Sequence, residues 1–369
     1  MRKLRVAIIG LGIGRQHALA YQSLPEQFEI AAVCAQSDES ARNAANDFGA
    51  THALTRFEDA VALRDVDVID VCTPPYLHAA QAEAALRAGK HVICEKPLAA
   101  TSAEVDALAR AEAQSGMRLM PIFQYRFGGG VQRARQLIDA GLTGPALAAT
   151  VEVHWRRRAN YYAVPWRGKR ATELGGVLTS QAVHALDALL YLLGAVRRVY
   201  AHTSTRSNPV EVEDCAAVSM ELVNGALATL SATLGSAVEI TRHRIVFERL
   251  VAESNTRPYS NSGDPWSFAA DDAAWQAEID AAVALVETAA PTTVTAPADA
   301  RRLKGYVPPA GFDTQLRKFH EAIVGGGALP VTIADARRAV ELLSAIYHSA
   351  RTHTAVELPL APGHPAYGS

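Results

Sequence analysis

The stretch Val6-Ala-Ile-Ile-Gly10-Leu-Gly12-Ile-Gly14-Arg-Gln-His17, near the start of the chain, decides the fold. An apolar run leads into a turn with three glycines, and a helical pattern follows at once. Glycine lets the backbone approach a pyrophosphate closely, and the N–H groups and dipole of the following helix attract anions. We therefore predict a dinucleotide site that includes Gly10, Gly12, Ile13 and Gly14. The alternative is a tight strand-to-helix turn without a ligand, because the third glycine comes one residue earlier than in G-x-G-x-x-G.

Short apolar runs alternate with helical patterns through the first third of the chain. The helical patterns cover residues 15–24, 38–48, 76–88 and 102–115. The strands are predicted at Leu4–Ile9, Glu29–Cys34, Val66–Cys72, His91–Cys94 and Arg118–Phe123, with a short one near residues 51–53. Strands that alternate with helices form a parallel sheet. The chain is therefore predicted to be of the α/β class, with a doubly wound Rossmann domain over residues 1–124 that binds NAD or NADP.

The pattern changes after this domain. Asn224-Gly225 predicts a hairpin turn between two strands, and hairpins build antiparallel sheets. We predict a C-terminal α+β domain over residues 125–369 with a mainly antiparallel sheet. Its helices are predicted at residues 131–140, 182–193, 312–325 and 333–351, and its strands at 146–156, 196–205, 214–223, 225–234, 238–248 and 356–358. Residues 254–268 are predicted to be an exposed loop, and the insertion 254–310 has no assigned role.

Composition limits the class of protein. Of the 369 residues, 49 % are hydrophobic, which excludes a disordered or coiled-coil chain. The net charge of -2 gives no basic field for nucleic acid, so we predict no nucleic-acid partner. Four widely spaced cysteines and the absence of a signal-like or membrane-spanning apolar stretch lead us to expect a cytoplasmic protein without a membrane partner.

The second predicted strand leaves the choice of dinucleotide open. A Rossmann domain often has an acidic residue there that binds the adenosine ribose. Here Ala35 stands at that place, and Ser37, Asp38 or Arg42 could contribute instead. We predict Ser37 as a cofactor contact and leave NAD and NADP as alternatives.

Two loops follow neighbouring strands of the predicted parallel sheet. The first is Thr73-Pro74-Pro75-Tyr-Leu-His78, and the second is Glu95-Lys96-Pro97. Ligands bind at the carboxyl ends of strands in open α/β sheets. We therefore predict Thr73, Pro74, His78, Glu95, Lys96 and Pro97 as cofactor-binding residues.

These motifs together resemble the glucose–fructose oxidoreductase/inositol dehydrogenase (Gfo/Idh/MocA) family. The glycine turn, the T-P-P-x-x-H loop and Glu-Lys-Pro occur in that order, and Gly175-Gly176-Val-Leu-Thr-Ser180-Gln181-Ala-Val-His184-Ala-Leu-Asp187 is similar to a further segment of the family. The C-terminal Leu329-Pro-Val-Thr-Ile-Ala-Asp335-Ala-Arg337 is also similar. The resemblance spans nearly the whole chain. It implies a Rossmann domain followed by a substrate-binding domain, residues 125–369, whose open sheet carries the sugar site and often the oligomer interface. It also implies hydride transfer between a sugar or polyol carbon and nicotinamide.

The resemblance places the catalytic lysine at Lys96 and the catalytic histidine at His184. The chemistry agrees, because oxidising an alcohol requires a base for the hydroxyl proton and gains from a donor to the developing alkoxide. The family often has an aspartate four residues before the histidine, and this chain has Ser180 there. A structural role for His184 is the alternative. A metal site with Asp187 lacks a third ligand, so no metal is predicted.

A basic and aromatic stretch, residues 155–170, comes before this segment. Aromatic rings stack on sugars, and arginine binds carboxylates in a bidentate manner. The stretch could equally be a solvated edge or a subunit contact. We predict as substrate-binding residues Lys96, Tyr162, Arg167, Lys169, Gln181 and His184.

The sequence therefore predicts an NAD(P)-dependent dehydrogenase that acts on a CH–OH group of a sugar, polyol or sugar derivative. The alternatives are a glycosidase that uses bound NAD transiently, and a non-catalytic regulator that binds dinucleotide and sugar. An open sheet face needs burial, so we expect a homodimer or homotetramer.

Overall fold

The computed structural model of the protein describes the backbone of residues 2–289 and 311–368 and the side chains of residues 2–285 and 311–368. Residues 290–310 of the predicted insertion lie outside this range. Contacts divide the chain into two compact units, and the first change of unit falls between Ile122 and Phe123. The segment Phe312–Arg337 also belongs to the first unit. The predicted second domain is one continuous stretch, residues 125–369, and therefore includes this segment.

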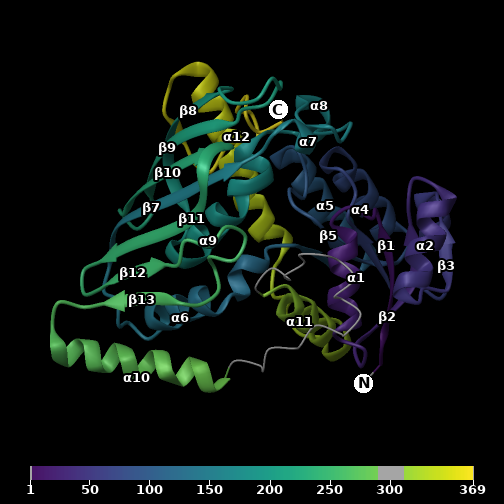
Figure 1. Cartoon of the computed structure of the whole chain (residues 1–369), viewed down its shortest axis with the longest axis horizontal. Helices are drawn as coiled ribbons and strands as arrows, with labels where there is room; N and C mark the ends of the chain where they lie inside the picture. The colour runs from purple at the N-terminus through teal and green to yellow at the C-terminus, as the bar shows by residue number, and fades with distance from the viewer. Residues whose placement is uncertain (1, 290–310, 369) are drawn as a thin grey trace. The chain divides into compact units, whose positions relative to one another are not determined.

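The first unit holds a parallel sheet of six strands in the order β3-β2-β1-β4-β5-β6 (Figure 1). This order confirms the doubly wound class, and it makes the carboxyl ends of β1, β4 and β5 neighbours. All four residues of β4 are buried, as expected for a strand covered on both faces. The strands are β1 (Leu4–Ile9), β2 (Phe28–Cys34), β3 (His52–Leu54), β4 (Val68–Val71), β5 (His91–Cys94) and β6 (Leu119–Pro121).

The helices of this unit begin and end at clear local signals. Helix α5 begins with a capping box between Thr101 and Glu104, and α2 ends at Gly49 in the left-handed conformation. A late helix, α11, packs its Phe312 ring edge against His17 of α1 at a centroid distance of 4.5 Å. The helices are α1 (Gly14–Gln22), α2 (Asp38–Phe48), α3 (Phe57–Ala62), η1 (Pro75–Leu77), α4 (His78–Arg87), α5 (Ser102–Ser115) and α11 (Phe312–Gly325).

The second unit holds an eight-stranded sheet in the order β13-β12-β11-β7-β10-β9-β8-β14 (Figure 1). The hairpin predicted at Asn224-Gly225 joins β9 and β10, and Gly225 has φ +87°. Every pair is antiparallel except β7 and β10, which run parallel. The strands are β7 (Ala146–Arg156), β8 (Val196–Ser204), β9 (Cys215–Leu222), β10 (Leu227–Thr233), β11 (Gly235–Phe247), β12 (Val251–Ser254), β13 (Trp266–Ala269) and β14 (Val356–Glu357).

Helix α9 (Val183–Leu193) is the core helix of the second unit. The ring of His243 in β11 donates a hydrogen bond from Nε2 to the backbone carbonyl of Ala185 at 2.9 Å, and this bond ties the helix to the sheet. The helical segment Arg170–Leu193 is long and apolar enough to cross a membrane, but 89 % of its most apolar window is buried inside the protein. The other helices are η2 (Gln124–Phe127), α6 (Gly129–Asp139), α7 (Ala159–Tyr162), α8 (Arg170–Glu173), η3 (Leu178–Ala182), α10 (Ala273–Ala289) and α12 (Ile333–Thr352), of which α12 belongs to this unit from Arg338 onward.

The prediction of an exposed loop at residues 254–268 is wrong in part. Arg257 and Tyr259 are exposed, but Asn261 is fully buried. Its side-chain amide donates to the ring of His243 at 2.8 Å, and its backbone carbonyl accepts from the Trp266 indole at 2.7 Å. The polar composition suggested solvent, whereas Asn261 makes these hydrogen bonds inside the fold.

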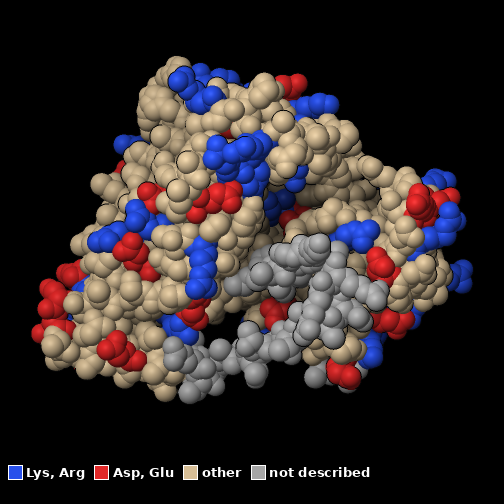
Figure 2. Space-filling view, viewed as in Figure 1, with Lys and Arg blue, Asp and Glu red and all other residues tan. Residues whose placement is uncertain are grey.

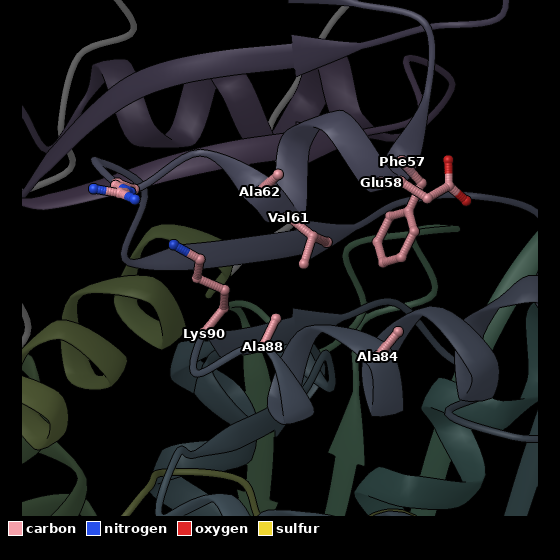
Figure 3. Close-up of a pocket in the computed structure, with 8 residues that line it drawn as sticks. Phe57, Glu58, Val61, Ala62, Ala84, Ala88 and Lys90 are labelled. Atoms are coloured by element: carbon pink, nitrogen blue, oxygen red, sulfur yellow. The ribbon is translucent and has the colours of Figure 1, made fainter.

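The surface carries charge of both signs. Figure 2 shows Lys and Arg interspersed with Asp and Glu on the face in view. Val61 and Ala62 of α3, with Ala84 and Ala88, line a hollow of about 460 Å³. Figure 3 draws these side chains. The Lys90 amine donates to the carbonyls of Leu63 and Val66 at the amino ends of β5 and β4. This hollow therefore lies at the amino ends of the strands, at the end of the sheet opposite the glycine turn.

Candidate active site

The three glycines of the first turn have three different surroundings. Gly10 has φ +94°, and a Cβ there would lie 2.6 Å from the carbonyl oxygen of Cys72. A Cβ on Gly14 would lie 2.9 Å from Cγ2 of Ile8, whereas a Cβ on Gly12 would meet no atom within 4 Å. These are the requirements of a tight turn, a close helix–strand contact and an open approach for a phosphate. The turn therefore fits a dinucleotide pyrophosphate.

The N-terminus of helix α1 favours the same ligand. No side chain caps the helix at Ile13, and its first turn has no acidic residue. Its first N–H groups therefore keep their capacity for an anion. Ser37 has a different local role, because its hydroxyl caps α2 by accepting from the N–H of Ser40 at 3.3 Å. A contact from Ser37 to the cofactor stays a prediction.

The two loops after β4 and β5 are fastened together by His78. Its Nδ1 lies 2.7 Å from the carbonyl oxygen of Pro97, and its Nε2 lies 2.7 Å from that of Thr73. Burial lowers the pKa of His78, so the neutral ring donates to one carbonyl at a time. The hydroxyl of Thr73 donates to Gln81 of α4 at 2.7 Å. His78 thus shapes the loops from inside, and direct contact of His78, Thr73 and Pro74 with a cofactor stays a prediction.

Lys96 lies in the second of these loops. The Lys96-Pro97 peptide bond is cis, and the Lys96 residue is half-buried. Its backbone N–H donates to Oε2 of the buried Glu95 at 3.1 Å. The carboxylate of Glu95 is therefore directed into the protein, where it fixes the backbone of the lysine.

Gly176 of the second unit lies against Glu213, whose carboxylate is buried and whose backbone leaves no room for a side chain at position 176. Oxygen atoms of Glu213 accept from the N–H of Gly176 at 3.0 Å and from the N–H of Leu178 at 3.0 Å. A Cβ on Gly176 would lie 1.7 Å from the Glu213 carbonyl oxygen. Burial raises the pKa of Glu213. This contact holds the start of the segment that carries His184.

His184 lies in the first turn of α9, directly after the π-helix η3, and is 8 % exposed. Its ring stacks on Tyr125 at a centroid distance of 5.0 Å. One turn further along, the Asp187 carboxylate accepts two hydrogen bonds from the guanidinium of Arg126, at 2.8 and 2.7 Å. Asp187 is thus an ion-pair partner of Arg126, and the stacked ring of Tyr125 orients His184.

Ser180 and Gln181 belong to a network around the buried carboxylate of Glu173. Oε1 of Glu173 accepts from the Ser180 hydroxyl at 2.8 Å and from Arg167 at 3.1 Å. Arg167 also donates to the hydroxyl of Tyr161, which accepts from the Gln181 amide at 2.9 Å. The carboxylate of Glu173 therefore lies beside position 180, where the family often has an aspartate.

The remaining predicted substrate residues differ in exposure. Tyr162 is half-buried, and burial raises the pKa of its hydroxyl. Lys169 is exposed. Among the described residues, the Tyr162 hydroxyl and Oε1 of Gln181 are buried atoms without a hydrogen-bond partner. Both atoms can therefore accept hydrogen bonds from a polar ligand.

Sequence reasoning missed Glu173, Glu213, Tyr125 and Arg126. The roles of Glu213, Tyr125 and Arg126 come from partners distant in the sequence: Arg126 is 61 residues from Asp187, and Glu213 is 37 residues from Gly176. Glu173 left a weak signal, because it is an acidic residue between a basic stretch and a pair of glycines.

A glycine cradle on a parallel sheet, joined to a second unit with an antiparallel sheet, defines a two-domain dinucleotide-dependent enzyme. The family model "Oxidoreductase family, NAD-binding Rossmann fold" matches residues 4–123, and the model of the GFO/IDH/MocA C-terminal domain matches residues 131–251. The chain belongs to the GFO/IDH/MocA oxidoreductase family.

Named relatives support this assignment. Levoglucosan dehydrogenase from Pseudarthrobacter phenanthrenivorans is 31 % identical over 266 residues, which are 63 % of this chain and 68 % of the relative. D-glucoside 3-dehydrogenase from Escherichia coli is 31 % identical over 207 residues, which are 54 % of this chain and 57 % of that protein.

Solved structures are similar over almost the full length. The WlbA dehydrogenase from Bordetella pertussis, in complex with NADH and UDP-GlcNAcA, has a TM-score of 0.82 at 26 % identity, over 98 % of this chain and 99 % of the other. Levoglucosan dehydrogenase, in complex with NADH and levoglucosan, has a TM-score of 0.80 at 25 % identity, over 97 % of this chain and 100 % of the other.

Proposed function

We propose that the protein is an NAD-dependent dehydrogenase that oxidises a secondary hydroxyl group of a sugar or polyol to a ketone. The glycine cradle at Gly10, Gly12 and Gly14 carries this proposal, because each glycine has the surroundings that a bound dinucleotide requires. The named relatives, two of which are dehydrogenases of sugars or glucosides, support the substrate class.

The residues of the chain supply the acid–base chemistry. A bound nicotinamide would supply the acceptor for the hydride that leaves the carbinol carbon. His184 accepts the hydroxyl proton, and its stacking on Tyr125 holds the ring in one plane. Lys96 donates a hydrogen bond to the oxygen as negative charge develops on it, while the Glu95 contact keeps its backbone in place. The roles of Lys96 and His184 rest on the family resemblance.

NAD rather than NADP is the proposed cofactor. Asp38 and Glu39 stand in the first turn of α2, just after the strand that leads to the ribose position. Two carboxylates there would repel a 2′-phosphate. Arg15 pairs with Asp47 at 3.5 Å, so this arginine is already engaged by an acidic partner.

A neutral sugar fits the second unit better than a sugar acid. The sequence suggested Arg167 as a carboxylate ligand, but this guanidinium pairs with Glu173 at 3.1 Å. Arg157 similarly pairs with Glu239 at 3.1 Å. The buried Tyr162 hydroxyl and Gln181 Oε1 suit sugar hydroxyl groups. We therefore assign Tyr162 and Gln181 to the substrate.

The first experiment measures NADH formation with NAD and NADP separately, against neutral monosaccharides, anhydrosugars, polyols and sugar acids. The wild type is expected to reduce NAD with a neutral sugar, whereas Lys96→Ala and His184→Ala lose about 100-fold or more of kcat. The exposed Lys318→Ala in α11 is the matched control for Lys96.

Other outcomes separate the alternatives. Release of an aglycone without net NADH would favour the NAD-assisted glycosidase. Tight dinucleotide binding without turnover on any substrate would favour the regulator. Full turnover of Lys96→Ala would overturn the catalytic assignment.

We further propose a cytoplasmic homodimer or homotetramer. The four cysteines are free, in keeping with a reducing compartment. Leu147, Val223 and Leu227 of the second unit are 52 %, 67 % and 61 % exposed, which favours a subunit interface there. Light scattering with size-exclusion chromatography tests the assembly, and a monomeric mass would contradict it.

A further inference from the structure

The first unit contains a buried charged cluster that the proposed mechanism does not use. His17 of α1 is fully buried, three residues after the last glycine of the turn. Its Nδ1 lies 2.8 Å from Oδ2 of Asp70 in β4, and its Nε2 lies 3.1 Å from Oε1 of Glu95 at the end of β5. The same Glu95 accepts from the backbone N–H of Lys96. A continuous chain of contacts thus joins the helix of the cofactor turn to the lysine loop.

The geometry fits a doubly protonated ring. A carboxylate only accepts hydrogen bonds, and a neutral imidazole donates from one nitrogen alone. Since both ring nitrogens face carboxylate oxygens, both contacts are satisfied when His17 is an imidazolium. Burial lowers the pKa of His17, but Asp70 and Glu95 outweigh burial and raise it to about 9.

The other groups around His17 support its charge or are apolar. The Tyr21 hydroxyl donates to Asp70 at 2.9 Å, and Cys72 Sγ lies 3.4 Å from the ring. Burial raises the pKa of Cys72 well above its ordinary value, so this thiol stays neutral. The edge contact with Phe312 covers the ring from α11. The positive charge is therefore shared between two carboxylates from neighbouring strands.

We propose that His17 is a positioning residue for Lys96: it binds Glu95 and Asp70 together and thereby sets the Glu95-Lys96-Pro97 loop against the helix that follows the glycine turn. The inference rests on the proposed catalytic role of Lys96. It predicts that an uncharged side chain at position 17 slows turnover without touching substrate or the reacting atoms.

The test compares His17→Gln, Glu95→Gln and the double variant with the wild type. His320→Gln is the matched control, because His320 is also a fully buried histidine of the first unit, but its ring donates to the backbone carbonyl of Arg2 at 2.8 Å. Thermal unfolding, the Kd for NADH, and kcat and KM for the sugar are measured for each variant.

Each of the two single variants is expected to lose about tenfold or more in kcat, the size typical of residues that orient an active group, with KM changed much less. The double variant should be no slower than the slower single variant, because both act through one link. His320→Gln should lose stability but keep kcat within about twofold of the wild type.

Three results would overturn the inference. One is wild-type kcat in His17→Gln while Lys96→Ala is inactive. Another is a double variant whose loss equals the product of the single losses. The third is loss of activity with a chelator, because His17, Asp70 and Cys72 would then hold a metal ion instead. If His17→Gln does not fold, Glu95→Gln alone tests the inference: a loss of kcat supports it, and an unchanged kcat contradicts it. Full activity of Lys96→Ala contradicts the proposed function itself and is distinguishable from all three.

Discussion

The hydroxyl of Ser180 donates a hydrogen bond to the buried carboxylate of Glu173 at 2.8 Å. The family often has an aspartate where this chain has Ser180, one turn before the predicted base His184. In this protein the carboxylate of Glu173, at the end of α8 and seven residues earlier in the sequence, lies beside that position. Glu173 also accepts from Arg167 at 3.1 Å and from the N–H of Gly168 at 2.5 Å, so its charge is compensated.

This arrangement predicts that restoring the aspartate is harmful. Ser180→Asp would place a carboxylate at a half-buried position within hydrogen-bond distance of the buried carboxylate of Glu173, and we expect a loss of about 1–3 kcal/mol in the free energy of unfolding. The double variant Ser180→Asp with Glu173→Gln should recover at least half of that loss, because it removes one of the two charges. Urea unfolding measures both values, with the exposed Glu211→Gln as the control. Higher stability of Ser180→Asp alone would contradict the role of Glu173.

Alanine is expected to act differently at two glycines of the turn, weakening NADH binding at Gly12 and lowering stability at Gly14. Gly12→Ala adds a methyl group in open space, so the melting temperature should change by less than about 2 °C, whereas the Kd for NADH should rise about tenfold or more. Gly14→Ala pushes the methyl group against buried Ile8 and Cys72, and we expect a loss of about 1–3 kcal/mol in stability. Calorimetry and NADH titration separate the two effects. Unchanged NADH affinity in Gly12→Ala would argue against the predicted position of the pyrophosphate.

Gly176 predicts a folding defect in the second unit. A methyl group there would overlap the backbone carbonyl of Glu213, and backbone cannot move aside as a flexible side chain can. We expect Gly176→Ala to lose about 3 kcal/mol or more in stability. Gly363→Ala is the control, because a Cβ at Gly363 meets no atom within 4 Å. Comparable melting temperatures for the two variants would show that the Glu213 contact does not constrain the segment.

The buried charge of His17 predicts how stability depends on pH. Its pKa rises from 6.5 to about 9 on folding, because Asp70 and Glu95 outweigh the effect of burial. The folded state therefore binds the proton more tightly than the unfolded state. The resulting stabilisation is complete below pH 6.5 and is lost as the pH rises through about 9.

Urea unfolding of the wild type and His17→Gln across this range checks the prediction. The difference in the free energy of unfolding should shrink as the pH rises from 6.5 to 9. The groups that face the ring are Asp70, Glu95, Tyr21 and Cys72, and burial raises the pKa of Tyr21 and of Cys72 well above the ordinary values. A constant difference would mean that His17 is neutral in the folded protein.

The sequence by itself determined the features that local pattern encodes. Apolar runs followed by helical patterns predicted the parallel sheet, and the strand–glycine–helix stretch predicted the dinucleotide turn, because both depend on residues close together in the chain. Asn224-Gly225 predicted its hairpin for the same reason. Motif order pointed to Lys96 and His184.

Only the tertiary structure decided which distant residues meet. It placed Phe312–Arg337 with the first unit, paired β7 with β10 in parallel, and buried Asn261 inside a polar loop. It also joined His17 to the distant Asp70 and Glu95, and it brought the carboxylate of Glu173 to Ser180, seven residues further along the chain. A buried carboxylate needs donors to compensate its desolvation, and sequence pattern cannot tell which donors the folded chain brings to it.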